Sequence, residues 1–253
     1  MDIKTAAVEL FRFMQANFGD SPQANTPEGD AEAARFWETP QGQVICRVTP
    51  LQRLTATDED FIKDWNELIV EGTTVRSNDD AYAYALAHLL IGLERRGTSS
   101  LGTVVDVGCG LMYLPQFLIQ HGITSGPVVG VEPSGAYIRQ VMERAREDGL
   151  SGLRVVRGYP WQLGLADSVA DAVLCLDVLH ECKHYLEMLG EISRVAKRDA
   201  VVVVSYCGCQ PRRVNVEPRF VAQKLEEFGI SVIRTSDSDK GSKLRKLVLG
   251  IKR

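Results

Sequence analysis

The sequence lacks both a long apolar run and the paired cysteines of a disulfide-rich domain. No stretch of its 253 residues approaches the roughly 18 consecutive apolar residues that a membrane-spanning helix needs. The first segment, MDIKTAAVELFRFMQANFG, has acidic residues within its apolar pattern, unlike a secretory signal. The six cysteines are scattered through apolar segments, which suits a reducing compartment. We therefore expect a cytoplasmic protein that has no membrane partner.

The sequence also has no excess of positive charge. Its formal net charge is -4, so nothing in the overall composition attracts nucleic acid. With 45% hydrophobic residues, the chain is long enough to bury a full core. We expect a small-molecule substrate and no nucleic-acid partner, and we leave open whether the protein forms a homodimer.

Strand signals are almost absent from the first part of the chain. Apolar residues recur there at helical spacing in three segments. These segments contain Ile3, Ala7, Leu10 and Met14, then Phe61, Trp65, Leu68 and Ile69, then Tyr82, Leu86, Leu89 and Leu93. The spacing predicts a mainly helical region over residues 1–98 that would cover a second domain over residues 99–253.

From Leu101 onward, strand and helix signals alternate. Seven short apolar runs are continuous and rich in β-branched residues, as expected for strands that are buried on both faces. They are TVVDV, PVVGV, LRVVR, DAVLCL, AVVVVS, ISVIR and KLVLGI, with helices expected at 113–121, 135–148, 184–197 and 217–228. This order predicts an α/β fold with a doubly wound, mostly parallel seven-stranded sheet. Ligands of such a sheet bind at the carboxyl ends of its strands.

The stretch VVDVGCGLMYLP follows the first predicted strand and lacks a third glycine. Gly108 and Gly110 would let the backbone approach a ligand at the start of a helix. A dinucleotide-binding turn would have a further glycine at the position of Tyr113. Asp106 would repel a phosphate but would attract a cation, such as a sulfonium or an ammonium group. These residues favour a positively charged nucleoside without phosphates.

The end of the first predicted strand and the turn after it carry Asp106, Gly108, Cys109 and Gly110. These residues resemble the first motif of the class I S-adenosylmethionine-dependent methyltransferases that act on small molecules. The segment VVGVEPS is similar to their second motif, whose acid is Glu132 here. The segment ADSVADAVLCLDVLHE is similar to their fourth-strand region, so the similarity extends over residues 101–253. The resemblance implies a Rossmann-like transferase with an N-terminal helical lid. It also implies S-adenosyl-L-methionine as the cofactor and S-adenosyl-L-homocysteine as the product.

This resemblance implies roles for the cofactor-binding residues. Gly108 and Gly110 would face the methionine part of the cofactor, and Asp106 would orient its amino group. Glu132 would accept hydrogen bonds from both ribose hydroxyls, as an acid does at the corresponding place in dinucleotide-binding folds. Pro133 would lie beside the adenine.

Two positions depart from the family pattern. Many members carry an acid after the third strand, where this chain has Tyr159. The ring of Tyr159 or of Trp161 could instead stack on the adenine. Met112 stands where a small residue is usual, and it could either pack under the helix as a flexible gap-filler or crowd the cofactor.

The candidate catalytic residues are Asp177 and His180, which follow the fourth strand where family members line the methyl-transfer cleft. A neutral imidazole at His180 could take a proton from the acceptor, although alignment alone supplies much of the rate. The alternative for His180 is a surface or helix-capping histidine. Zinc would accept His180, Cys182 and His184, but on a helix Cys182 would point away from the two histidines. We therefore expect no metal.

Three functions are compatible with these residues. The first is methyl transfer to an oxygen, nitrogen or carbon atom of a small molecule. Aromatic residues in the region 1–98 and the segment PRR at 211–213 hint at an aromatic or carboxylate-bearing substrate. The second is an inactive methyltransferase-like protein that binds a nucleoside or a protein partner. The third, a nicotinamide-dependent oxidoreductase, is disfavoured by Tyr113 and Asp106.

Overall fold

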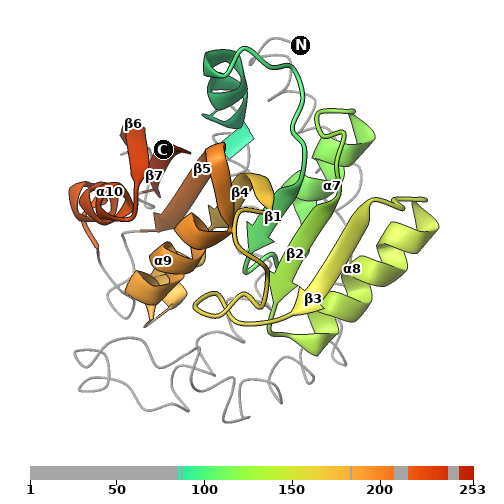
Figure 1. The fold of residues 1–253 in the computed structure, drawn as a ribbon. Helices are drawn as coiled ribbons and strands as arrows, with labels where there is room; N and C mark the ends of the chain where they lie inside the picture. Colours follow the sequence, from blue (N-terminus) through green and yellow to red (C-terminus); the bar gives the residue numbers. More distant parts are fainter. Residues whose placement is uncertain (1–84, 87, 183, 208–215, 239–244) are drawn as a thin grey trace, which may run out of the picture.

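The structure is a computed structural model that describes residues 85, 86, 88–182, 184–207, 216–238 and 245–253 (Figure 1). The helices expected near residues 3–14 and 61–69 lie outside the described residues. Residues 85, 86 and 88–95 are helical, as their spacing predicts. The elements that follow are β1 (Val104–Val107), α7 (Tyr113–Gln120), β2 (Val128–Glu132), α8 (Gly135–Glu147), β3 (Leu153–Arg157), β4 (Ala170–Leu176), a 3-10 helix (Leu179–Glu181), α9 (Tyr185–Val195), β5 (Ala196–Cys207), α10 (Pro218–Glu227), β6 (Ile230–Ser238) and β7 (Arg245–Lys252).

The seven strands form one sheet in the order β3-β2-β1-β4-β5-β7-β6. Strands β1 to β5 pair in parallel, whereas β7 is antiparallel to both of its neighbours. The predicted doubly wound, mostly parallel sheet is therefore confirmed. Each central strand is flanked by others and covered on both sides, which explains why the strand sequences are continuous apolar runs.

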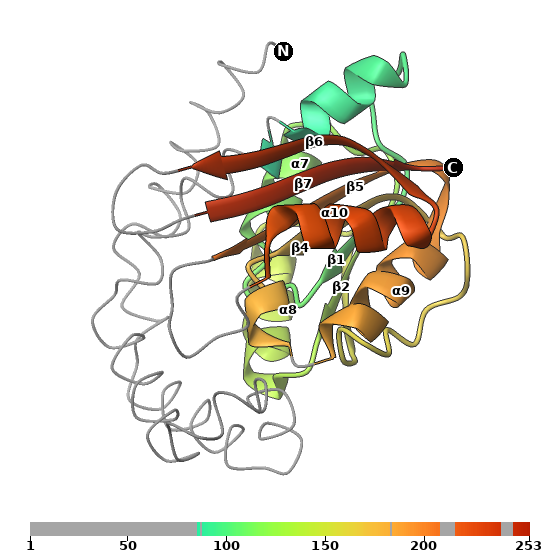
Figure 2. The same cartoon turned by 90° about the vertical axis from the view of Figure 1, so that its left-hand side faces the viewer.

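Helices cover both faces of the sheet and create two buried clusters (Figures 1 and 2). Apolar residues of α7 and α8 pack on one face, and those of α9 and α10 pack on the other. Neighbouring strand residues alternate between the clusters, with Val104 in the first and Val105 in the second. This layering brings the carboxyl ends of the parallel strands to a common edge.

The helical residues 85–95 share the first cluster with the sheet. Leu86, Leu89 and Leu93 are buried in it. The helix lies close to β5, because a Cβ added to Gly92 would be 2.6 Å from Cγ1 of Val201. The end of the predicted N-terminal region therefore contributes directly to the core of the sheet.

The predicted element limits are close to the observed ones, except at the junction of α9 and β5 and at β6, which continues beyond the predicted run ISVIR to Ser238. The helix predicted for 184–197 ends at Val195, because β5 already begins at Ala196. Ala196 pairs with Ala170 of β4, so its backbone is part of the sheet and cannot continue the helix. Strand β5 is consequently longer than the apolar run at 200–205 from which it was predicted.

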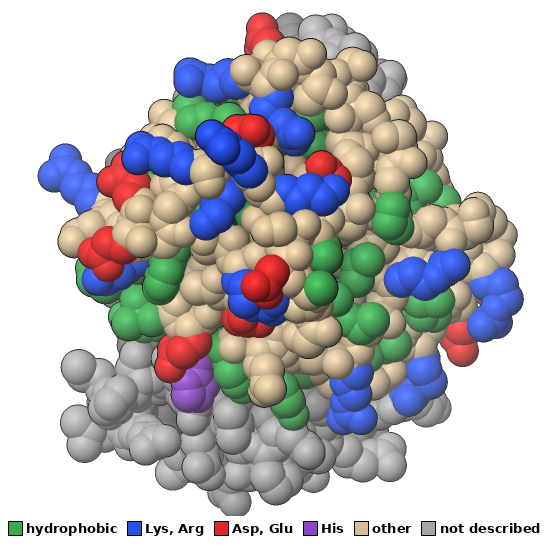
Figure 3. Space-filling model, viewed as in Figure 1, with side chains coloured by type: hydrophobic (Ala, Val, Ile, Leu, Met, Phe, Trp, Pro, Cys, Tyr) green, Lys and Arg blue, Asp and Glu red, His purple; other side chains and the backbone are tan. Residues whose placement is uncertain are grey.

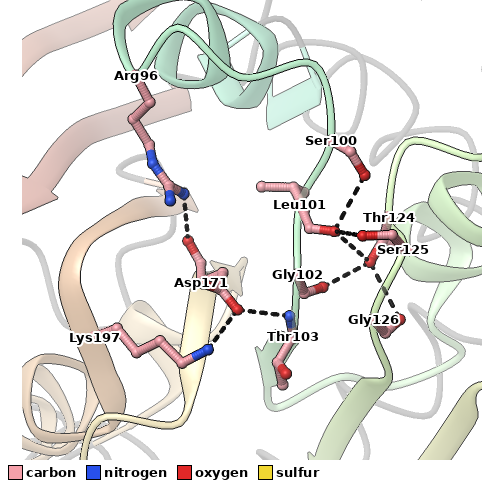
Figure 4. Close-up of polar contacts among 10 residues, drawn as sticks. All are labelled: Arg96, Ser100, Leu101, Gly102, Thr103, Thr124, Ser125, Gly126, Asp171 and Lys197. Atoms are coloured by element: carbon pink, nitrogen blue, oxygen red, sulfur yellow. Dashed lines mark hydrogen bonds and ion pairs between the residues drawn. The ribbon is translucent and has the colours of Figure 1, made fainter.

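An ion-pair network fastens the other edge of the sheet, where β1 and β4 begin (Figure 4). Oδ2 of Asp171 accepts hydrogen bonds from the backbone N–H of Thr103 at 2.8 Å and from Nζ of Lys197 at 2.7 Å. Arg96 donates to the carbonyl of Asp171 at 3.2 Å. Burial raises the pKa of Asp171, but these donors outweigh it and hold the pKa below its ordinary value. The network joins the described helix before the sheet to β4 and β5.

The face shown in Figure 3 carries basic and acidic side chains in mixed positions, with apolar groups in small separate areas. Among the described residues, the exposed large hydrophobic side chains are Val156, Leu186 and Phe228. They come from different elements, so single exposed apolar residues of this kind need no functional explanation.

Candidate functional site

The turn after β1 is built from alternating residues with left-handed backbone conformations. The φ angles are 66° at Gly108, 48° at Gly110 and 54° at Met112. The N–H groups of Gly108 and Cys109 both donate to the carbonyl of Val131, at 2.9 and 3.2 Å. The turn is therefore held at the end of β2, and α7 begins directly after it.

The two glycines are needed for different reasons. A Cβ added to Gly108 would lie 2.6 Å from Cγ2 of Val178, which follows β4. At Gly110, in contrast, no atom of the described residues lies within 4 Å of an added Cβ. Gly108 thus permits close packing inside the protein, whereas Gly110 leaves space in which a ligand can approach its backbone.

Glu132 is buried at the end of β2 and holds the turn with both carboxylate oxygens. Oε2 accepts a hydrogen bond from the N–H of Gly110 at 3.0 Å, and Oε1 accepts one from the N–H of Ser134 at 2.9 Å. A carboxylate has about four lone-pair sites, so each oxygen keeps capacity for a second donor. Glu132 can therefore position the turn and still bind a pair of hydroxyl groups.

Asp106 forms an acidic pair with Glu132. Asp106 is in register with Gly130, two residues before Glu132, so both side chains leave their strands on the same face. Burial, followed by the charge of Glu132, raises the pKa of Asp106 to about 8. Burial raises the pKa of Glu132 to about 7, despite the hydrogen bonds from Ser134 and Gly110. Such a pair favours a cationic ligand and disfavours a phosphate.

Met112 packs inside the protein. Its side chain belongs to the buried cluster on the α7 and α8 face. Its sulfur and that of Cys109 would lie 2.7 and 2.5 Å from a Cβ on Gly130. Of the two alternatives for Met112, the structure thus shows the gap-filler, and its backbone adopts the left-handed conformation that a glycine would adopt more easily.

On the expected adenine side, three rings form a column. The rings of Tyr159 and Trp161 stack with centroids 5.0 Å apart, and Trp161 is also 5.0 Å from the ring of His184. The N–H of Gly158 donates to the carbonyl of Glu132 at 3.3 Å, which brings the residue before Tyr159 to the end of β2. Pro133 is buried between Glu132 and the N-terminus of α8.

The candidate catalytic residues lie beyond β4, the strand next to β1. Asp177 has a left-handed backbone with φ 59°, and its N–H donates to the carbonyl of Ser205 at 2.9 Å. His180 is on the 3-10 helix and only 3% exposed, so it is not a surface residue. Both residues therefore follow a strand that ends at the same edge of the sheet as β1 and β2.

The HxCxH residues do not converge. Cys182 is buried in the cluster on the α9 face, and the ring of His184 packs against Trp161. Within the described part of the chain, no group of three or more His, Cys, Asp or Glu residues is arranged to hold a metal ion. The aromatic residues expected to line a substrate pocket (Phe36, Trp37, Phe61, Trp65, Tyr82 and Tyr84), and likewise Arg212 and Arg213, lie outside the described residues.

Sequence reasoning missed Ser205 and the pair of Glu191 and Arg194. Ser205 is buried near the end of β5, and its hydroxyl has no hydrogen-bond partner among the described residues. It is in register with Leu176, directly before Asp177. A serine after the run AVVVV could have been noticed as a polar residue at a strand end. Glu191 and Arg194 show only the i,i+3 spacing of a helix ion pair in the sequence, and the path of the loop before β4 gives them their partners outside α9.

Comparisons with known proteins agree with this geometry. Residues 105–204 match the model of the methyltransferase-domain family. A search of curated proteins found none that matches the sequence. Among the described residues, no helix is long and apolar enough to cross a membrane.

Solved structures with the same fold include the magnesium protoporphyrin IX methyltransferase (ChlM) of Synechocystis PCC 6803 with bound S-adenosylmethionine. It is 17% identical, with a TM-score of 0.56, over 90% of this chain and 99% of that chain. A methyltransferase dependent on the same cofactor from Aquifex aeolicus is 22% identical, with a TM-score of 0.53, over 64% and 88% of the two chains. The [4+2]-cyclase SpnF is 15% identical, with a TM-score of 0.56, over 66% and 82% of the chains.

The family match covers the segment that contains the glycine turn, the acidic pair and β4. In the described sheet, β7 lies between β5 and β6 and is antiparallel to both. Residues 105–204 therefore match the methyltransferase-domain family, and the chain has the Rossmann-like fold of the solved S-adenosylmethionine-dependent methyltransferases.

Proposed function

We propose that this protein transfers the sulfonium methyl group of S-adenosyl-L-methionine to an oxygen, nitrogen or carbon atom of a small molecule. The observation that carries the proposal is the buried pair of Asp106 and Glu132 beside the open backbone of Gly110. A family match alone would not establish activity, because one fold can serve several functions.

The residues at the edge of the sheet fit the cofactor. Glu132 has free acceptor capacity for the two ribose hydroxyls, and Asp106 would bind the amino group of the methionine part. Gly110 leaves room for that part, and Tyr159, at the end of the ring column and supported by Trp161, offers a ring face to the adenine. When bound, the cofactor supplies an electrophilic methyl group on a positively charged sulfur.

Asp177 and His180 are the proposed acceptor-side residues. Transfer requires the accepting atom to be aligned with the methyl group, and residues after β4 are adjacent to the turn after β1. A neutral imidazole at His180 would remove the proton from a hydroxyl, an amine or an acidic carbon as the bond forms. Asp177 would anchor the acceptor or serve as the base itself.

A small-molecule acceptor is supported by the described function of one structural neighbour, which methylates magnesium protoporphyrin IX in Synechocystis. We further propose that the acceptor is aromatic or carries a carboxylate, because of the aromatic residues in the region 1–98 and the arginines of the segment PRR at 211–213. We also propose a cytoplasmic location and a substrate other than nucleic acid. The domain limits proposed are residues 1–98 for the covering region and 99–253 for the catalytic domain.

A second candidate is a member of the family that performs no methyl transfer. The structural likeness to the cyclase SpnF supports keeping it, because that protein is described by a different reaction. The packing of Met112 argues against one route to inactivity, since its side chain lies in the core and not over Gly110.

Calorimetric titration with S-adenosyl-L-homocysteine tests the proposal. We expect binding by the unchanged protein and a loss of about 1.5 to 3 kcal/mol of binding free energy in Glu132→Ala, the range for hydrogen bonds to charged groups. Glu227→Gln, an exposed acid on α10, is the matched control and should bind normally. Unchanged affinity in a folded Glu132→Ala variant would remove Glu132 from the site. No binding by the unchanged protein would overturn the proposed function.

A further inference from the structure

The loop between β3 and β4, residues 158–169, runs along one face of α9. His184 precedes the helix, and Glu191 and Arg194 lie 7 and 10 positions further on, which is the spacing of a single helix face. His184 contacts Trp161 at the start of the loop. Glu191 and Arg194 contact its later residues, so the face follows the loop over most of its length.

Three side-chain contacts fasten the middle of the loop to this face, and the backbone N–H groups of Ser168 and Val169 fasten its end to the carbonyls of Arg194 and Val195 at 2.9 and 2.8 Å. Oε2 of Glu191 accepts the N–H of Leu163 at 2.9 Å. Nη1 of Arg194 donates to the carbonyl of Leu165 at 2.8 Å and to Oδ1 of Asp167 at 2.6 Å. Of the loop residues 164–168 only Leu165 is partly buried, and it packs against the cluster on the α9 face. The side chains of Glu191 and Arg194 therefore supply the remaining contacts that set the path of the loop between Leu163 and Asp167.

Glu191 and Arg194 also hold each other in a fixed geometry. Nε and Nη2 of Arg194 donate to Oε1 and Oε2 of Glu191 at 2.6 and 2.8 Å. These bonds from Arg194 are the main cause that keeps the pKa of Glu191 below its ordinary value, against the effect of burial. The planar guanidinium thus joins the carboxylate on one edge and the loop on another, which the single ammonium of a lysine cannot reproduce.

The beginning of the same loop reaches the proposed cofactor site. Gly158 donates to the carbonyl of Glu132, and Tyr159 comes next in the chain. Tyr159 stacks on Trp161, and Leu163 is two residues further on. A shift of the loop on α9 would therefore be passed through Trp161 to Tyr159, the residue that follows the one bonded to Glu132.

We propose that Glu191 and Arg194 are positioning residues for the adenine of the cofactor, acting through the loop 158–169 that carries Tyr159 and Trp161. This role rests on the proposed function, because it requires a cofactor at Glu132. It differs from a purely stabilising role, in which loss of Arg194 would lower the free energy of unfolding without coupling to Tyr159.

A double-mutant cycle separates the two roles. We expect Arg194→Gln to weaken binding of S-adenosyl-L-homocysteine by roughly three- to thirtyfold, the range for couplings carried through a packed network. In a Tyr159→Ala background the same change should have little further effect, because the ring that Arg194 positions is absent. Arg194→Lys should retain only part of the affinity. Lys224→Gln, which removes an ion pair with Glu227 on α10, is the control and should bind like the unchanged protein.

Unfolding in urea shows whether each variant is folded under the binding conditions. If Arg194→Gln is not folded, Glu191→Gln replaces it in the double-mutant cycle. The amide oxygen of the introduced glutamine can still accept a hydrogen bond from the N–H of Leu163, which favours folding of this variant. Unchanged affinity in the folded variant, or losses that multiply in the double variant, would overturn the positioning role. Failure of the unchanged protein to bind would instead overturn the proposed function.

Discussion

The sulfur of Met112 occupies the space that a side chain on Gly130 would need. It would lie 2.7 Å from a Cβ at that position, and the sulfur of Cys109 would lie 2.5 Å from it. Gly130 is on β2 and in register with Asp106. The missing side chain on the strand thus makes room for a bulky residue in the turn, where the family usually has a small one.

This relationship predicts non-additive effects on stability. Gly130→Ala should lower the free energy of unfolding by about 1 to 3 kcal/mol, because the methyl group overlaps two sulfurs in a packed core. In a Met112→Ala background it should cost clearly less, since half of that overlap is gone. Urea unfolding of the two single variants and the double variant measures the difference. If the losses of unfolding free energy in the two single variants add up to that of the double variant, the contact with Met112 is not what excludes a side chain at position 130.

The acidic pair predicts that the unliganded protein loses stability as the pH rises. The pKa of Asp106 is raised to about 8 and that of Glu132 to about 7, so between pH 4 and 8 the folded state binds more protons than the unfolded state. The free energy of unfolding contributed by the pair therefore falls across this window and is lost above it. Urea unfolding at several pH values should show this slope, and Asp106→Asn should flatten it. The same slope in both proteins would assign it to other groups.

Cofactor binding should release protons near neutral pH. The ammonium group of the ligand favours the ionised form of Asp106, which is partly protonated in the unliganded protein. Affinity for S-adenosyl-L-homocysteine should then rise between pH 6 and about pH 8 and level off above. Titrations in two buffers with different ionisation enthalpies count the protons released. A heat of binding that is identical in both buffers would contradict the prediction.

Gly108 and Gly110 should respond differently to alanine. An alanine at either position disfavours the left-handed backbone conformation and should lower the free energy of unfolding by about 1 to 2 kcal/mol. Gly108→Ala adds an overlap with Val178 and should be the less stable variant, whereas Gly110→Ala should fold and chiefly weaken cofactor binding. Thermal unfolding combined with calorimetric titration separates the effects. Equal stability of the two variants would argue against the overlap at Gly108.

Ser205→Ala should not destabilise the protein. The hydroxyl is buried and has no hydrogen-bond partner in the described part of the chain, so its removal relieves a desolvation cost and breaks no bond there. The free energy of unfolding should stay the same or increase by up to about 1 kcal/mol. A clear decrease would mean that the hydroxyl has a partner in solution. Ser205→Val, which is larger, would then distinguish a lost bond from altered packing.

Some features were accessible from the sequence because they depend on short-range pattern. Continuous β-branched runs such as AVVVVS indicate strands that are covered on both faces, and their alternation with helices predicts the parallel order. Asp106 is the next-to-last residue of its predicted strand and Glu132 follows the next run, so the sequence already indicates that both acids lie at the carboxyl ends of neighbouring parallel strands. The exact ends of α9 and β5 were less accessible, because pairing with β4 decides where the helix stops.

The sequence by itself therefore determined the α/β order of the chain and the two acids beside the glycine turn. Each of these follows from residues that are local or lie at strand ends. Only the tertiary structure decided where Met112 packs, that Ser205 is buried without a partner among the described residues, and that Glu191 and Arg194 contact the loop of Tyr159. The physical reason is that such contacts join residues far apart in the chain. Whether a polar side chain meets water or a partner is fixed only when the elements pack together.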